Sequence, residues 1–324
     1  MKKIAVIGAG QLGSRHLQAL KGVEHDLSIS VVDNFQESLD VAKERYDGFN
    51  VTGGNHTVKY FDSISKLEDK DFDVVISATS SNARFVTLSE LYSVAKVKYF
   101  VLEKVLFDKP EDYKTFAEML KKNGTKAYVN CSMRTMPFYR DIKKYFEGTE
   151  TQYFVTGCDY RLLSNLIHYV DHMVYLTGDT NFAVDTSLLH KKFMVSKRAG
   201  FHEFNGTAII KFSKGSAGLF TSYNEGGSPA VVEIMNENCR IISREYQGKI
   251  WMQKKENNWE WEELDFRIPY QSELTKNIVT DLLENGKSDL VEYSESANTH
   301  VQLYHPIWEH YNANNEKLDY YPFT

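Results

Sequence analysis

The first half of the chain alternates short apolar runs with segments of helical periodicity. The apolar runs are rich in β-branched residues and lack a polar face, as expected for strands buried on both sides of a sheet. Strands of this kind that alternate with helices are typical of βαβ units and predict a doubly wound parallel sheet. The predicted strands are residues 3–7, 28–33, 58–61, 73–79, 98–104 and 126–130, and the predicted helices include residues 82–94 and 110–122.

From about Thr151 the pattern changes to paired strands separated by short polar turns. The turns lie at residues 214–216, 236–238 and 256–258. Apolar runs on both sides of such turns predict antiparallel hairpins that follow one another as a meander.

Two helices are expected near the end of the chain, one at residues 272–284 and one that begins near Glu295 and meets Pro306. The change of pattern places a domain boundary near Cys131. We therefore predict an α/β domain at residues 1–130. An α+β domain with an open, mostly antiparallel sheet would follow at residues 131–324.

Composition narrows the class of protein. The 324 residues are 42% hydrophobic and 25% charged, as in an ordinary globular protein. A net charge of −6 without a long basic run argues against nucleic acid as a partner. Three widely spaced cysteines suit a reducing compartment, and no segment is apolar for long enough to cross a membrane. We expect a soluble, cytoplasmic protein with neither a nucleic-acid nor a membrane partner.

A glycine-rich loop follows the first predicted strand. It reads Gly8-Ala9-Gly10-Gln11-Leu12-Gly13, a G-x-G-x-x-G pattern, and a predicted helix follows it. An acidic residue, Asp33, ends the next strand twenty residues after Gly13. This context predicts a dinucleotide site, in which glycines let the backbone approach a pyrophosphate at a helix N-terminus. The alternative is a purely structural turn.

Asp33 bears on the choice of dinucleotide. Its carboxylate can accept hydrogen bonds from ribose hydroxyls and would repel a 2′-phosphate, and neither Asn34 nor Phe35 offers a neutralising arginine. The sequence therefore favours NAD over NADP. Asp33 could also cap the following helix, a role that is compatible with ribose binding.

The segment that begins SNLIHYVDHM combines two histidines with apolar residues. On a helix its polar positions form one narrow stripe. A metal site would need a third ligand, and none is identifiable beside His168 and His172. Buried core histidines are a second interpretation. Acid–base chemistry at His168 is the third and is favoured, because histidine carries protons near neutral pH. The stripe consists of Ser164, Asn165, His168, Asp171, His172 and Tyr175.

Lys104 lies just past a predicted parallel strand. Ligands of open α/β sheets bind beyond the carboxyl ends of the strands, so this lysine is placed to meet a substrate. Its ammonium could stabilise an alkoxide that forms as a hydride leaves, and Glu103 could orient it or balance its charge. A merely solvated lysine is the alternative.

The order of these motifs resembles the Gfo/Idh/MocA oxidoreductases over essentially the whole chain. The residues that carry the resemblance are GAGQLG, Asp33, DVVISAT, LEKV, SMRTMPFY and HYVDHMVYLTG. The resemblance implies an NAD-binding Rossmann domain followed by an α+β domain whose open sheet often forms an oligomer interface. A homodimer or homotetramer through that sheet is accordingly expected.

The resemblance also implies roles for individual residues. Lys104 and His168 would be catalytic, and Val105 replaces the proline that usually follows the lysine. Ser164 stands where the family usually has an aspartate, so a proton relay would lack one charged member. The implied cofactor residues are Gly8, Gly10, Gln11, Leu12, Gly13, Asp33, Thr79, Glu103 and Lys104. The implied substrate residues are Lys104, Arg134, Ser164, Asn165 and His168; no metal is expected.

Two classes of function follow. The first is an NAD-dependent oxidoreductase that acts on a secondary hydroxyl or keto carbon of a sugar, sugar nucleotide or cyclitol. The alternative is a catalytically lapsed NAD-binding protein that senses redox state or serves a partner, and its main support is Ser164. Reduction of a C=C or C=N bond is a third possibility.

Overall fold

The computed structural model describes residues 1–324, which divide into two units. The first unit comprises Met1–Asn130 and Pro269–Ser296, and the second comprises Cys131–Ile268 and Ala297–Thr324. The division expected from the sequence, at residues 1–130 and 131–324, assigned residues 269–296 to the second domain. In the structure these residues belong to the first unit. This return of the chain to the first unit has a physical reason, because helix α7 (Gln271–Asn285) buries Ile278, Val279 and Leu282 in the first unit's core.

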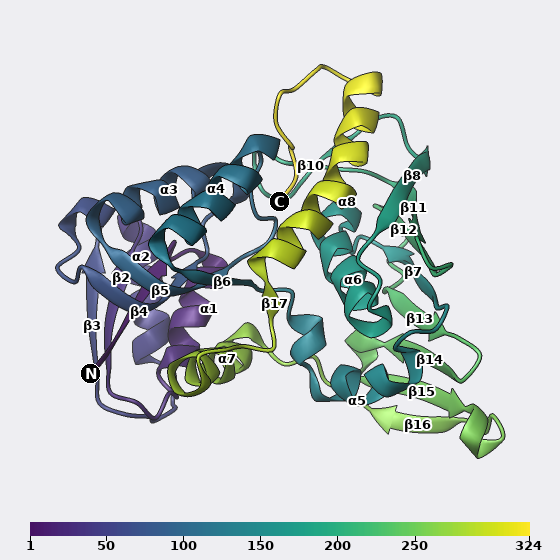
Figure 1. Ribbon diagram of the computed structural model, residues 1–324, viewed down its shortest axis with the longest axis horizontal. Coiled ribbons are helices and arrows are strands. Elements are labelled where there is room, and N and C mark those ends of the chain that lie inside the picture. The colour runs from purple at the N-terminus through teal and green to yellow at the C-terminus, as the bar shows by residue number, and fades with distance from the viewer. The chain divides into compact units, whose positions relative to one another are not determined.

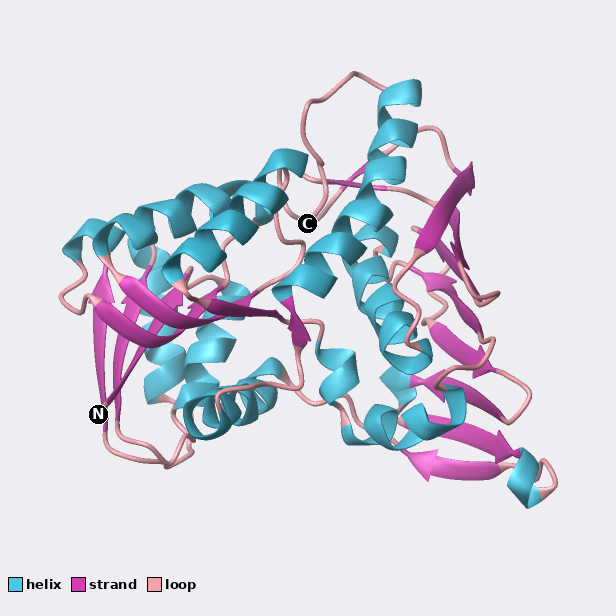
Figure 2. Ribbon diagram, viewed as in Figure 1, coloured by secondary structure: helices cyan, strands magenta, loops and turns pink.

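The first unit is built on a seven-stranded sheet in the order β17-β6-β5-β4-β1-β2-β3 (Figures 1 and 2). Six strands are parallel, and β17 pairs antiparallel with β6 at one edge. The strands are β1 (Lys2–Ile7), β2 (Leu27–Val32), β3 (His56–Phe61), β4 (Asp71–Ser77), β5 (Lys96–Leu102), β6 (Lys126–Val129) and β17 (Val291–Glu292). The predicted doubly wound sheet is confirmed.

Helices cover both faces of this sheet. Helices α1 (Gln11–Leu20), α2 (Gln36–Asp47) and α7 share a core with β1, β2 and β4 on one face. Helices α3 (Ser81–Val94) and α4 (Pro110–Asn123) lie on the other face (Figure 1). There, Phe100 of β5 packs against Phe116 of α4, with ring centroids 5.9 Å apart. Burial on both faces explains why these strands read as continuous apolar runs.

The second unit contains an eight-stranded sheet in the order β16-β15-β14-β13-β7-β12-β11-β8. The expected hairpins are present, but the sheet is not a simple meander. Strand β7 inserts between β13 and β12 and runs parallel to β12. The bounds are β7 (Gln152–Cys158), β8 (Phe182–Leu189), β11 (Gly206–Phe212), β12 (Ala217–Tyr223), β13 (Val231–Met235), β14 (Cys239–Arg244), β15 (Lys249–Lys254) and β16 (Glu262–Asp265). The sheet is mostly antiparallel, as predicted. A separate short pair joins β9 (Met194–Val195) to β10 (His202–Glu203).

One face of the second sheet packs against helix α6 (Leu162–Thr177), which carries the two-histidine segment. Inward side chains such as Tyr153 and Phe220 meet this helix, and Gly178 ends it with a φ of +69°. Helix α5 (Pro137–Phe146) precedes β7, and α8 (Tyr293–Asn314) begins in the first unit and continues in the second. Helix α8 runs through Pro306 instead of ending there.

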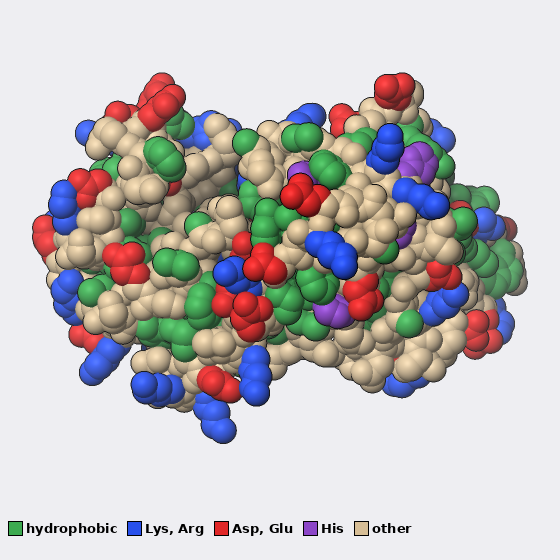
Figure 3. Space-filling view, turned by 90° about the horizontal axis from the view of Figure 1, so that it is seen from above, with side chains coloured by type: hydrophobic (Ala, Val, Ile, Leu, Met, Phe, Trp, Pro, Cys, Tyr) green, Lys and Arg blue, Asp and Glu red, His purple; other side chains and the backbone are tan.

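The charge of the surface and the length of the helices bear on nucleic-acid and membrane partners. Acidic and basic side chains intermingle on the face in Figure 3, where no continuous basic patch is visible. Every helix is too short or too polar to span a bilayer.

Candidate functional site

The glycine loop is held by contacts that leave no room for side chains. Gly8 has a φ of +90°, and a Cβ there would lie 2.8 Å from the backbone nitrogen of Thr79. A Cβ on Gly13 would lie 1.8 Å from the carbonyl oxygen of Gly8. Gly10, by contrast, has no neighbouring atom within 4 Å of a Cβ. The first and third glycines therefore shape the loop, and Gly10 keeps its outer side open.

Helix α1 begins at Gln11, directly behind this loop. No side chain caps its N-terminus, so backbone N–H groups of the first turn are available to an anion. Arg45 of α2 donates hydrogen bonds to the side-chain oxygens of Gln11 and Ser14, each over 2.7 Å. The start of α1 is thus held in place, and the arrangement fits the pyrophosphate of a dinucleotide.

Asp33 lies at the carboxyl end of β2 and supports the loop. Its carboxylate accepts hydrogen bonds from the backbone N–H groups of Ala9 (2.7 Å) and Phe35 (2.9 Å). Asp33, Gly8 and Thr79 line one cavity of about 230 Å³, so the structure brings these three predicted cofactor residues together. The cavity's position beside the loop fits the adenosine half of a dinucleotide.

Sequence reasoning missed several residues of this cavity. Asp62 and Ser63 follow the end of β3, and Thr87 and Glu90 project from α3. The position of Asp62 after a parallel strand was a signal that could have identified it. Thr87 and Glu90 had no such signal, because the sequence pattern does not show which side of α3 meets the cavity.

The end of β5 places Glu103 and Lys104 at the same edge of the sheet. Glu103 is buried, and its Oε1 lies 3.0 Å from Nε2 of His16 and accepts a hydrogen bond from Asn130. Burial alone would raise the pKa of this carboxyl, but the hydrogen bonds and the charges of His16 and Lys104 lower it to about 2. Lys104 is half-buried, and its peptide bond to Val105 is cis.

A network missed by the sequence analysis extends from Glu103. Nδ1 of His16 lies 2.7 Å from the hydroxyl of Thr275 on α7, and Gln271 also accepts a hydrogen bond from Asn130. Glu103 is thereby connected to the glycine-loop helix and to the returning segment at residues 269–296. Each partner is distant in sequence, so no local motif could reveal the network.

The polar stripe of α6 divides into two parts. Ser164, Asn165, His168 and Tyr175 are half-buried, whereas Asp171 and His172 are buried. Arg134 forms a buried ion pair with Asp171, with Nε–Oδ2 at 2.9 Å and Nη2–Oδ1 at 2.6 Å. This two-point contact fixes the guanidinium of Arg134. Its predicted contact with substrate stays a prediction.

His172 is a core histidine. Its Nδ1 shares a hydrogen bond with the hydroxyl of Tyr153 over 3.1 Å, and its Nε2 has no hydrogen-bond partner. Burial, together with the positive charge of Arg134, lowers its pKa to about 3. The ring is therefore neutral at physiological pH.

The start of α6 is bound by a carboxylate from another element. Glu203, at the end of β10, is 5% exposed and accepts hydrogen bonds from the backbone N–H of Leu163 (2.7 Å) and Ser164 (3.1 Å). It also accepts one from the hydroxyl of Ser164. Asn165 instead donates from its amide to the backbone carbonyls of Tyr160 and Arg161. Sequence reasoning missed Glu203, which lies 39 residues beyond Ser164.

The family prediction can be compared with known proteins. Residues 2–131 match the Gfo/Idh/MocA family model, described as an oxidoreductase family with an NAD-binding Rossmann fold. The matched segment is less than half of the chain, agrees with the predicted family and corresponds to the Rossmann-type sheet of the first unit. A comparison with the curated proteins gives no match.

Solved structures share the fold over nearly the whole chain. UDP-N-acetylglucosamine 3-dehydrogenase from Acidithiobacillus ferrooxidans has a TM-score of 0.69 at 13% identity, covering 93% of this chain and 94% of that one. Myo-inositol dehydrogenase from Lactobacillus casei, in complex with NAD(H) and myo-inositol, has a TM-score of 0.64 at 17% identity, covering 93% and 92%. Biliverdin reductase from Synechocystis sp. PCC 6803 has a TM-score of 0.66 at 13% identity, covering 92% and 95%. At these identities the likeness shows the fold alone.

Two glycine substitutions should separate folding from cofactor binding. Gly13→Ala places a methyl group 1.8 Å from a backbone oxygen, so we expect loss of the folded first unit. Gly10→Ala meets no atom in the chain, so we expect normal thermal unfolding but weakened NAD binding. Circular dichroism melting and NAD titration measure the two effects. Equal stability of the two variants would contradict this assignment of the glycines.

His172 should make stability depend on pH. Because its pKa is about 3 in the folded chain and about 6.5 when unfolded, folding is favoured above pH 6.5 and loses stability as the pH falls toward 3. From pH 7 to 5 this group should cost about 2 kcal/mol, and His172→Asn should lack that part of the loss. Denaturant unfolding at both pH values measures the difference. Parallel pH profiles for wild type and variant would refute the assignment.

Proposed function

We propose that this chain, whose first unit is the NAD-binding domain of a Gfo/Idh/MocA oxidoreductase, is an NAD-dependent dehydrogenase or reductase. It transfers a hydride between nicotinamide and a secondary hydroxyl or keto carbon of a sugar, sugar nucleotide or cyclitol. The observation that carries this proposal is the position of Lys104. It follows β5 at the sheet edge where β1 and β2 end in the glycine loop and Asp33.

Lys104, His168 and Glu103 would each have a separate role in the reaction. Bound NAD supplies a carbon that accepts or donates the hydride. Lys104 donates a hydrogen bond to the reacting oxygen and stabilises the negative charge that develops on it. His168 exchanges the hydroxyl proton with solvent. The ionised Glu103, fixed by His16 and Asn130, balances the lysine charge and holds the strand end in position.

The remaining predicted substrate residues have different environments. Ser164 is half-buried and donates its hydroxyl hydrogen to Glu203, and we assign its oxygen to accept a hydrogen bond from a substrate hydroxyl. Asn165 and Arg134 bond to the chain itself, so they would support the site's shape unless a substrate displaces those bonds.

The cofactor cavity supports NAD over NADP. Asp33, Asp62 and Glu90 line it, and no lysine or arginine is among the lining residues. A 2′-phosphate would therefore meet three carboxylates, of which Asp62 is paired with Lys66 over 2.6 Å while Asp33 and Glu90 have no ion-pair partner. This arrangement extends the argument made from Asp33 alone.

The similar structures support the class of substrate without selecting one. Two of them are named for a sugar nucleotide and for a cyclitol, and both are dehydrogenases. Biliverdin reductase has the same fold, so the fold by itself does not require a sugar substrate. The catalytically lapsed alternative, which rests on Ser164, predicts tight NAD binding without turnover.

A hydride-transfer screen tests the proposal. Wild type is offered NAD or NADP with sugars, sugar nucleotides and inositols, and NADH with keto-sugars, while the reduced-nicotinamide absorbance is followed. We expect turnover that prefers NAD and falls at least about 100-fold in Lys104→Ala, because the developing charge loses its donor. The exposed Lys109→Ala is the matched control. NAD binding without turnover on any substrate would favour the lapsed alternative.

The outer face of the second sheet supports a homo-oligomer. The face opposite α6 carries half-buried apolar side chains in its central strands, beside polar and charged ones such as Thr221, Glu233 and Lys211. A face of this kind is typically covered by another molecule. We propose a homodimer or homotetramer that pairs this face with that of a second copy. The apolar members are Phe154, Ile209, Leu219, Val231, Met235, Ile242 and Trp251.

Charged substitutions on this face should dissociate the oligomer. We expect Phe154→Glu and Leu219→Glu to be monomeric in sedimentation velocity, because each would bury a carboxylate in the interface. Val86→Glu, at an exposed position of α3 in the first unit, should leave the assembly unchanged. A wild-type monomer at micromolar concentration would exclude the proposed interface.

A further inference from the structure

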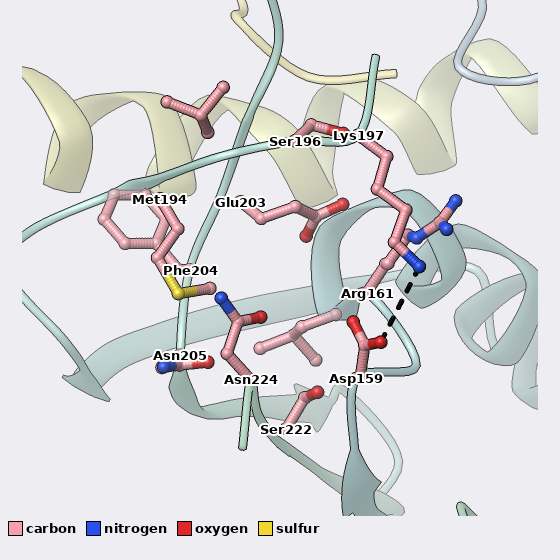
Figure 4. A pocket seen from close by; sticks show the side chains of 12 residues that line it. Asp159, Arg161, Met194, Ser196, Lys197, Glu203, Phe204, Asn205, Ser222 and Asn224 are labelled. Carbon is pink, nitrogen blue, oxygen red and sulfur yellow. Dashed lines mark ion pairs between the residues drawn. The ribbon is translucent and has the colours of Figure 1, made fainter. Parts of the chain in front are cut away.

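Arg84 is a buried arginine to which the proposed reaction assigns no role. It lies in the first turn of α3, and its side chain is 1% exposed. Arg161, by contrast, is exposed beside a polar cavity of the second unit, where a ligand can reach it (Figure 4). A buried guanidinium is costly unless its N–H groups find acceptors, so the partners of Arg84 indicate what it does.

The guanidinium of Arg84 bonds to backbone carbonyls beyond the ends of two neighbouring strands. Its Nη1 donates to the carbonyl oxygens of Leu106, over 2.6 Å, and of Val105, and its Nη2 donates to that of Thr79. Thr79 follows β4, whereas the other two residues follow β5, the partner of β4 in the sheet. These carbonyls lie past the last paired residues of the strands, so the ladder gives them no donor. One side chain thus joins two strand ends.

Lys104 lies between two anchored residues. Before it, the buried carboxylate of Glu103 is held by the network that includes His16. After it, Val105 is fully buried, and its carbonyl accepts the hydrogen bond from Arg84. The backbone of Lys104 is therefore held from both directions, which leaves its half-buried side chain as the part that can meet a ligand.

The other end of the Arg84 contact reaches the cofactor cavity. Thr79 lines that cavity, and its backbone nitrogen lies 2.8 Å from the place that a Cβ on Gly8 would take. A shift of Thr79 would therefore change the cavity wall beside the glycine loop. Because the planar guanidinium holds Thr79 with one nitrogen and the Lys104 segment with the other, it sets the spacing between the cavity and the lysine.

We propose that Arg84 is a positioning residue that fixes Lys104 relative to the cofactor cavity. The proposal rests on the proposed function and deepens it, because it names a residue that aligns the reacting groups without touching them. The guanidinium is enclosed and bonded to three carbonyls, so it acts only through the strand ends. A displacement of about 1 Å in a reacting group can cost about 100-fold in rate, so such a contact matters to the reaction.

Hydrogen exchange measured by mass spectrometry tests the contact without turnover. Arg84→Lys keeps the charge but replaces the planar fork with one ammonium, which cannot reach both strand ends. Arg84→Gln, which avoids a buried charge, is measured beside it. We expect amides at residues 79–82 and 103–107 to exchange at least about tenfold faster, with β2 and α2 unchanged.

The matched control is Arg140→Lys, exposed on α5, which should change neither segment. Unchanged exchange at residues 79–82 and 103–107 in a folded Arg84 variant overturns the proposal. Failure of both Arg84 variants to fold also overturns it, because the arginine would then stabilise the whole unit and not one arrangement within it.

Kinetics distinguish positioning from general stabilisation. With a substrate that turns over, Arg84→Lys should lower kcat about 100-fold and change the substrate's KM less than about threefold. In a Lys104→Ala background the same substitution should cost less than about threefold in kcat, because the group that it positions is gone. Losses in kcat that add in the double variant overturn the proposal.

Two outcomes separate this proposal from the proposed function. Faster exchange confined to the two segments, with no turnover by wild type on any substrate, supports the role of Arg84 and counts against the oxidoreductase. Turnover by wild type, with exchange and kcat unchanged in Arg84→Lys, does the reverse.

Discussion

The cofactor domain depends on the close approach of Gly13 to the carbonyl of Gly8. That contact leaves no space for a Cβ, and it lets α1 begin immediately behind the loop that follows β1. The uncapped start of α1 therefore faces the sheet edge at which Asp33 and Lys104 also lie. Two hydrogen-bonded supports maintain this arrangement: Asp33 holds the loop through the N–H of Ala9, and His16 connects α1 to Glu103. A backbone constraint thus determines where the chemistry of the first unit can occur.

The second unit assembles its polar edge differently, by bringing a charge from a distant element. The resemblance to the oxidoreductase family leads one to expect a carboxylate at position 164, where the chain has a serine. The structure places the carboxylate of Glu203 against the hydroxyl and N–H of Ser164. The residue change is accordingly not a simple loss of charge from this region. The lapsed alternative, which rested on the missing charge at this position, therefore loses part of its support.

Local patterns predicted the six parallel strands, the hairpin strands of the second sheet, the glycine loop and Asp33, because each depends on residues close together in sequence. They did not predict β7, β8 or the short strands β9, β10 and β17. The buried strands of the parallel sheet read as continuous apolar runs, and the expected hairpins of the second sheet form at their polar turns. Contacts between distant segments were not predictable. The apolar face of α7 is visible in the sequence, but nothing in that pattern identifies α1 as its partner. Likewise Glu203, His16 and Thr275 carry no local signal, and β7 enters the second sheet between strands that the sequence suggested were adjacent.

The division of the chain into two discontinuous units limits how one unit can be separated from the other. The backbone passes from one unit to the other three times, after Asn130, Ile268 and Ser296. A fragment that stops at residue 130 would lack α7 and β17, and would therefore expose the apolar surface of α1 that α7 covers. Neither unit is a continuous piece of sequence. Recombination between related genes can thus exchange a complete unit only if it replaces two separate segments together, which favours inheritance of the two units as a linked pair.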